Sequence, residues 1–185
     1  MKYPSVCILM MVLAIGVAGP FAYAHQKGWP GKRLSQTYPA AAKFTSRQVT
    51  LPSDQLGRIE QAIGERVEPE NRVPTFYPAF NKAGEKIGFV LFADQVGENG
   101  VIEIGIAVDP AGKVRHVVIF ASREDKRIGK DEFLDQFHGK TVKDPLKVGA
   151  DITPVAGAEK ASQAVATGVR KVLLIKQEVF GEQNP

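Results

Sequence analysis

The sequence predicts an α+β fold, an antiparallel β-meander covered by helices, and three observations support it. Four consecutive segments rich in β-branched and aromatic residues are separated by short stretches of turn composition. Near the C-terminus, apolar residues recur at the spacing of one helix face. The chain has no internal repeat, and its 185 residues suit one domain with a sizeable core.

The composition is that of an ordinary globular protein, with 44% hydrophobic and 24% charged residues. The net charge is only +4, and no Arg/Lys cluster alternates with aromatic residues. Nucleic acid is therefore not an expected partner. The only cysteine, Cys7, lies in the apolar N-terminal run, so the rest of the chain has no disulfide, no thiolate metal site and no covalent haem.

The N-terminus has the pattern of a secretory signal peptide. Lys2 precedes an apolar run, and Ala22-Tyr23-Ala24 gives a small-x-small end. This predicts a signal peptide over 1–24 and export to the periplasm or to the outer face of the cytoplasmic membrane. An uncleaved anchor is the alternative, although a span needs about 20 residues and Gly19-Pro20 interrupts this run.

After the signal peptide we expect a flexible leader over 25–33 and a single domain over 34–185. Before the meander the expected elements are a helix over 34–44 limited by Pro39, a strand over 44–51, and a helix over 52–67 with Ser53 as N-cap and Gly64 as terminator.

The meander is predicted over 75–80, 87–93, 101–108 and 114–121. Strand alternation directs Ile102, Ile104 and Ile106 to the core. Gly105 interrupts the β-branched run, which indicates a bulge or a close backbone approach.

Two helical patterns follow the meander. The shorter has Phe133, Leu134 and Phe137 on one face and ends at Gly139. The longer begins near Ala158, and its predicted buried stripe consists of Ala161, Val165, Gly168, Val169 and Val172. The small residues of this stripe predict close packing on the sheet.

The small turn Ala156-Gly157-Ala158 opens the longer helix. A helix start offers free backbone N–H groups and the positive end of the dipole, which suits a phosphate. However, Glu159 stands where an anion site favours a hydroxyl or a bare amide. Lys160 could neutralise this acid or a phosphate.

The segments "IAVDPAGKVRHVVIF", "FLDQFHGK" and "ASQAVATGVRKVL", together with this turn, resemble the FMN-binding domain family from about Leu34 to Phe180. The family includes the flavin subunits of Rnf complexes and of the sodium-pumping NADH:quinone reductase. Its turn usually reads Asp-x-x-Ser/Thr-Gly-Ala-Thr, and a flavin transferase joins FMN to the threonine through a phosphoester. The resemblance implies electron transfer with membrane-bound or periplasmic redox proteins.

The family turn is incomplete in this chain. Gly157 and Ala158 match, but Glu159 stands in the place of the acceptor threonine. Ala156 replaces the preceding Ser/Thr, and Asp151 lies two residues farther from the glycine than the family spacing. A phosphoester needs a hydroxyl oxygen, so we expect no covalent flavin here.

Non-covalent FMN remains compatible with the sequence. The expected cofactor-binding residues are Thr153, Gly157, Ala158, Glu159, Lys160 and Ser162. A flat apolar wall for the flavin ring is expected from the aromatic residues Phe76, Tyr77, Phe89, Phe92 and Phe120.

Two other interpretations stay open. Cleavage after Ala24 would make His25 the N-terminal residue, which can chelate copper, with His116 or His138 as a second ligand. Alternatively, the chain keeps the fold without the cofactor and serves as a cofactor-free or metal-binding periplasmic partner or assembly protein.

No hydrolase or nucleotide-binding motif is present, which favours an electron-transfer or binding module over a catalyst with its own substrate.

Overall fold

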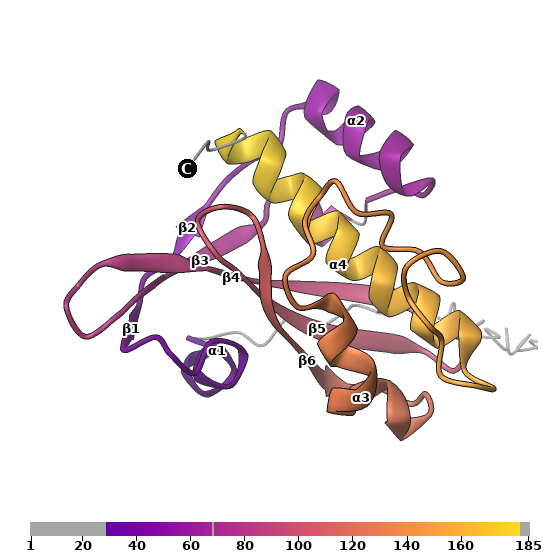
Figure 1. Cartoon of the computed structure of the whole chain (residues 1–185). Coiled ribbons are helices and arrows are strands. Elements are labelled where there is room, and N and C mark those ends of the chain that lie inside the picture. The colour runs from indigo at the N-terminus through magenta and orange to yellow at the C-terminus, as the bar shows by residue number, and fades with distance from the viewer. Residues whose placement is uncertain (1–28, 68, 182–185) are drawn as a thin grey trace, which may run out of the picture.

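The computed structural model describes residues 29–67 and 69–181, and a twisted antiparallel sheet lies at its centre (Figure 1). The strand order is β1-β3-β4-β5-β6, and β2 pairs with β3. The strands are β1 (Lys43–Phe44), β2 (Arg47–Gln48), β3 (Thr75–Phe80), β4 (Lys86–Val96), β5 (Val101–Val108) and β6 (Val114–Ala121). The predicted four-stranded meander is confirmed, and β4 is longer than predicted because its pairing with β5 continues to Val96.

Helices cover both faces of the sheet. The helical elements are α1 (Gly31–Thr37), α2 (Ser53–Ile63), η1 (Pro69–Arg72), η2 (Lys126–Gly129), α3 (Asp131–Leu134), η3 (Asp135–Phe137) and α4 (Glu159–Phe180). Figure 1 shows α4 lying across the sheet, with α2 beside its C-terminal part. The segment from η2 to η3 follows the outer edge of β6.

The N-terminal elements differ from the prediction at their ends. Helix α1 begins at Gly31, inside the expected leader, and stops at Thr37. It stops there because Pro39 disfavours helical backbone at Tyr38. The expected strand over 44–51 is reduced to the short strands β1 and β2. The predicted signal peptide and leader residues 25–28 lie outside the described residues.

Helix α2 confirms one expected end and corrects the other. Gly64 takes a positive φ of 77° and terminates the helix. Ser53, however, is the first helical residue, and the N-cap position belongs to Pro52, which makes no side-chain capping bond.

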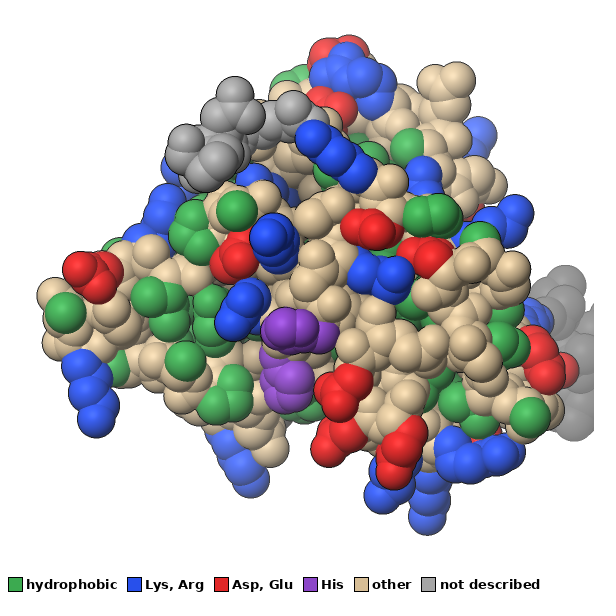
Figure 2. All heavy atoms as spheres, in the orientation of Figure 1, with side chains coloured by type: hydrophobic (Ala, Val, Ile, Leu, Met, Phe, Trp, Pro, Cys, Tyr) green, Lys and Arg blue, Asp and Glu red, His purple; other side chains and the backbone are tan. Residues whose placement is uncertain are grey.

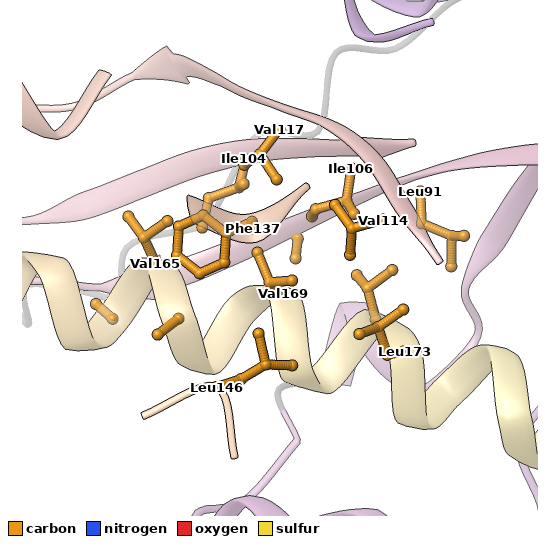
Figure 3. Close-up of a cluster of buried hydrophobic side chains, with 14 of the residues drawn as sticks. Leu91, Ile104, Ile106, Val114, Val117, Phe137, Leu146, Val165, Val169 and Leu173 are labelled. Atoms are coloured by element: carbon orange, nitrogen blue, oxygen red, sulfur yellow. The ribbon is translucent and has the colours of Figure 1, made fainter. Parts of the chain in front are cut away.

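The main core lies between α4 and the sheet (Figure 3). In Figure 3, Val165, Val169 and Leu173 of α4 point toward the side chains of the sheet. The predicted inward residues Ile102, Ile104 and Ile106 are buried, as are Phe133, Leu134 and Phe137 on the η2–η3 side, so both predictions are confirmed.

A smaller core lies on the opposite face, under α1. It contains Leu34, Tyr38, Ala79, Val90 and Ala107. Gly105 permits this packing, because a Cβ there would lie 2.6 Å from Thr37 Oγ1 and 2.6 Å from Phe120 Cε2. The expected close backbone approach is confirmed, whereas the register shifts of β5 lie at other positions.

Substitution Gly105→Ala is expected to lower the free energy of unfolding by about 1–3 kcal/mol, because the added methyl group overpacks the smaller core. Gly57→Ala is the matched control. A Cβ at Gly57 meets nothing within 4 Å, and in the middle of α2 it should be neutral or stabilising by up to about 1 kcal/mol. Chemical denaturation measures both; equal effects would contradict the packing role of Gly105.

Candidate functional site: the turn before helix α4

The turn before α4 is closed by the side chain of Glu159. Gly157 has a φ of +79°, a conformation that favours glycine. This backbone directs the Gly157 N–H toward Glu159, and the carboxylate Oε1 accepts its hydrogen bond at 2.9 Å. The hydrogen bond from Gly157, followed by that from the backbone of Glu159 itself, lowers the pKa of this carboxyl. Glu159 is therefore an ionised acid in the first turn of its own helix, where the helix dipole favours a negative charge.

The hydroxyl of Ser162 forms hydrogen bonds inside the turn. Ser162 is 0% exposed, and its Oγ donates to the Ala158 carbonyl at 2.9 Å while it accepts from the Val155 N–H at 3.0 Å. These two bonds join the residues before the turn to the first turn of α4. Ser162 supports the turn from inside and does not face solvent.

Thr153 is held by another part of the chain. Its backbone N–H donates to Gln136 Oε1 at 2.8 Å, and its carbonyl accepts from Gln136 Nε2 at 3.1 Å. These bonds fix the segment leading to the turn against η3. Of the six predicted cofactor-binding residues, Gly157, Ala158, Glu159, Lys160 and Ser162 form the turn and the helix start, and Thr153 precedes them.

Arg127 is a second cation at the turn that the sequence analysis missed. Its Nη2 donates to the Ala156 carbonyl at 3.0 Å and lies 2.6 Å from Asp125 Oδ2. Hydrogen bonds from Arg127 hold the pKa of Asp125 at about 2. Charges of both signs surround Arg127 in the sequence, and no local signal shows which of them reaches a turn 29 residues away.

The side chain of Asp151, the aspartate compared with the family motif, makes its contacts within its own loop and with Lys140. Its Oδ1 accepts from the Lys147 N–H at 2.9 Å, and Oδ2 lies 2.9 Å from Lys140 Nζ. Burial alone would raise the pKa of Asp151, but the Lys147 N–H and Lys140 lower it overall. These contacts tie Asp151 to the loop and to Lys140 rather than to the turn.

The predicted aromatic wall is not at the turn. Phe76 and Phe89 pack against Phe180 at the last residue of α4, about 30 Å along the helix from Glu159 at ~1.5 Å per residue. Tyr77 and Phe92 lie on the opposite face of the sheet, because successive strand residues alternate between faces, and Phe120 packs with them. The prediction of one wall was therefore wrong.

The candidate metal ligands do not form a complete site in the described part of the chain. His25 lies outside it. His116 Nδ1 is 3.3 Å from the Thr37 carbonyl, and His138 is exposed. No group of three or more His, Cys, Asp or Glu suited to a metal occurs among residues 29–67 and 69–181. The copper site stays a prediction.

The charges on the visible face are mixed. In Figure 2 the Lys and Arg side chains are interspersed with Asp and Glu over the whole face. One acid of the loop after β6, Glu124, is largely buried and accepts from the Asn99 N–H at 2.6 Å. Glu124 therefore fastens the β4–β5 turn. Within the described ranges, no helix has the length and apolar character to cross a membrane.

Comparison with known proteins identifies the family. No family model matches the chain. The chain is 31% identical over 147 residues to a subunit of the proton-translocating ferredoxin:NAD(+) oxidoreductase complex of Clostridium ljungdahlii, an alignment that covers 74% of this chain and 76% of that protein. This chain belongs to the family of that protein. The resemblance to the FMN-binding domain family is thereby confirmed.

A solved structure, NqrC of Shewanella oneidensis, is also similar to this member of the FMN-binding domain family. The similarity covers 77% of this chain and 73% of NqrC, with 16% sequence identity and a TM-score of 0.47.

The hydrogen bond from the Gly157 N–H to ionised Glu159 predicts a pH-dependent loss of stability in Glu159→Gln. Because folding lowers the pKa of Glu159, its charge stabilises the fold above the ordinary value of 4.5, and this contribution is lost as the pH falls through the folded pKa. We expect Glu159→Gln to have a lower melting temperature than the parent protein near neutral pH, and the same melting temperature as the parent in acid. Glu98→Gln, at an exposed acid in the β4–β5 turn, is the control in thermal melts. A difference in melting temperature that is independent of pH would contradict a stabilising role for the ionised carboxylate.

Proposed function

We propose that this protein is an exported electron-transfer protein of the FMN-binding domain family, and that any FMN it holds is bound without a covalent link. Its relative from Clostridium ljungdahlii is named as part of a proton-translocating complex that acts on ferredoxin and NAD(+). This supports a membrane-bound or periplasmic redox protein as the partner. The proposal on the flavin linkage rests on Glu159, whose carboxylate accepts from the Gly157 N–H and offers no hydroxyl.

FMN held at this turn would need a site for its phosphate group, either as a phosphoester or without a covalent link. A phosphoester at the family position does not fit, because Glu159 cannot form one and the nearby Ser162 hydroxyl is bonded inside the turn. A non-covalent phosphate fits if the exposed Glu159 side chain turns away from Gly157. The helix start would then offer its N–H groups, with exposed Lys160 supplying positive charge. A bound flavin would carry the electrons, and the protein would hold and orient it.

A second candidate function is a cofactor-free partner or assembly protein on the same fold. One observation favours it: the Gly157–Glu159 hydrogen bond satisfies the turn without any ligand. The main core is likewise formed by the chain's own side chains. Loss of the cofactor would therefore leave the scaffold folded and its surfaces available to a partner.

Absorption spectroscopy distinguishes the two candidates. The mature protein, exported from cells that also express a flavin transferase, is measured before and after denaturation and desalting, and its metal content is read on the same sample. A flavin spectrum that disappears on denaturation supports the electron carrier. A flavin that remains attached contradicts the interpretation of Glu159, and a colourless protein that ignores added FMN supports the cofactor-free partner.

Restoring only the acceptor hydroxyl should not restore covalent flavin. We expect Glu159→Thr, produced with an active transferase, to stay free of covalent FMN, because Ala156 and the spacing of Asp151 also depart from the family turn. A family member with a complete turn is the positive control, and mass spectrometry of the denatured protein is the measurement. Covalent flavin on the single variant would show that the hydroxyl alone suffices.

A further inference from the structure

A basic surface lies on the α4 face of the sheet, around the C-terminal end of the helix. It consists of Lys43, Arg47, Lys82, Lys86 and Lys176. Strand register places three of these side chains: Lys43 of β1 lies opposite Phe80 of β3, which lies opposite Lys86 of β4. Arg47 of β2 lies opposite Phe76, a residue of the main core. Paired residues direct their side chains to the same face, so these three cations share the face on which α4 packs.

Aromatic rings position two of the cations. Lys86 Nζ lies 5.0 Å from the centroid of the Phe89 ring, and Arg47 Cζ lies 5.7 Å from that of Phe180. The two rings stack with their centroids 4.9 Å apart. A cation–π contact attracts a cation but leaves its charge unneutralised. Both cations are exposed, so this ring pair holds two positive charges at the surface.

A pocket of about 350 Å³ lies between β1 and the turn that joins β3 to β4. Lys43 from one side and Lys82 from the other line it, together with the side chains of Thr45 and Phe80. No acid among the described residues lines this pocket. Two amines and a hydroxyl that converge on a concave site suit a carboxylate or another anion. In Figure 1 the β3–β4 hairpin that carries the pocket projects past the C-terminal end of α4.

Lys176 of α4 is a nearly buried cation of the same surface. It is 5% exposed, and its Nζ lies 3.4 Å from the position that a Cβ on Gly112 would take. Burial lowers the pKa of Lys176, Asp109 raises it, and the nearby Lys86 lowers it again. Within the described ranges Lys176 has no hydrogen-bond or ion-pair partner. Because buried lysines are almost always paired, an anionic group of another molecule would be favourable here.

Two acids lie near these cations, and each is bonded within its own turn. Asp109 Oδ1 accepts from the Lys113 N–H at 2.9 Å, and Glu85 Oε2 accepts from Asn81 Nδ2 at 2.7 Å. None of the five cations forms an ion pair with any acid of the described residues. The five cations exceed these two acids by three charges, which gives the surface a local positive excess.

The spread of the cations favours a protein segment over one small anion. Lys43 and Lys86 are two strand spacings apart, about 10 Å, and Lys43 and Arg47 are up to about 13 Å apart along the chain. A single phosphate or carboxylate cannot contact groups at these separations. A flat layer of lipid headgroups would not enter the pocket or reach Lys176, whereas protruding acidic side chains would.

We propose that the basic surface docks an acidic segment of a partner protein, with one carboxylate in the pocket between Lys43 and Lys82 and another at Lys176. Complementary charges of this kind steer the encounter and fix its register. The site lies at the end of α4 away from the Gly157–Glu159 turn, so docking leaves that turn accessible. The inference goes beyond the proposed function. It requires no flavin, so it can hold or fail independently of the cofactor.

The test measures binding of an acidic peptide. The exported protein is titrated into a peptide of alternating Asp and Glu that carries a neutral dye, and fluorescence anisotropy gives the Kd at low and at physiological ionic strength. A peptide of alternating Asn and Gln is the uncharged control. Carbodiimide coupling of the acidic peptide to the protein, mapped by mass spectrometry, then identifies the lysines that it contacts.

We expect the acidic peptide alone to bind, to couple to lysines of the basic surface, and to bind more weakly as salt is added. Lys43→Glu/Lys82→Glu should raise its Kd about tenfold or more, because two attractions become repulsions. The matched control is Lys32→Glu/Lys126→Glu, at exposed lysines of α1 and η2, which should leave the Kd unchanged. Equal losses in the two variants, or no binding by the parent protein, would overturn the proposal.

Lys176→Met separates docking from a structural role. It should raise the Kd of the acidic peptide, and it should leave the free energy of unfolding unchanged or higher, because it removes a buried amine that has no partner. Chemical denaturation of the same samples measures stability. A variant that is less stable but binds the peptide as the parent does would overturn the part assigned to Lys176.

Two further measurements distinguish a protein partner from other anions. Displacement of the peptide by inorganic phosphate, at an ionic strength at which sodium chloride does not displace it, would overturn the proposal in favour of a small-anion site. Binding to vesicles of anionic phospholipid that Lys43→Glu/Lys82→Glu abolishes and the control variant keeps would overturn it in favour of a membrane. We expect neither result.

Discussion

Helix α4 packs on the sheet at a separation that only small residues permit, and the other elements of the functional site depend on this contact. A Cβ at Gly168 would lie 2.8 Å from Ile104 Cδ1 and 3.0 Å from Gln95 Cγ. The helix holds its neighbours in turn: Glu178 pairs with Arg58 of α2 at 2.8 Å, and Gln163 accepts from the Val148 N–H at 3.0 Å. The start of α4, and with it the turn, is therefore held by these packing and hydrogen-bond contacts.

These contacts, together with the hydrogen bond inside the turn, explain how the turn accommodates Glu159. In a turn that served only to hold a phosphate, an acid would oppose the function and would contribute nothing else. Here the acid ionises on the positive end of the helix and satisfies the Gly157 N–H. The same carboxylate that offers no hydroxyl, on which the proposed non-covalent binding rests, also stabilises the backbone of the turn, so family membership alone does not establish the cofactor.

Patterns within one element were readable from the sequence, and contacts between elements were not. Alternation and helical spacing identified the meander, the buried stripe of α4 and the close approach at Gly105. The contact of Arg127 with Ala156 joins segments that local composition does not relate. The start of α1 was missed because the local sequence signals for this helix are weak. Packing on the sheet, which those signals do not report, stabilises the helix over Gly31–Thr37. The prediction of a single aromatic wall was wrong because it did not take into account the strand alternation that places Phe76 and Tyr77 on opposite faces.

The aromatic residues on the two faces of the sheet differ in how deeply they are buried. Under α4, Phe76, Phe89 and Phe180 are mutually packed and complete the main core. On the α1 face the helix is short, and the rings beyond it stay at the surface. The same glycine, Gly105, admits Thr37 of α1 and brings Phe92 and Phe120 together. One position of β5 therefore sets both how closely α1 covers this face and how closely the rings of β4 and β6 approach each other.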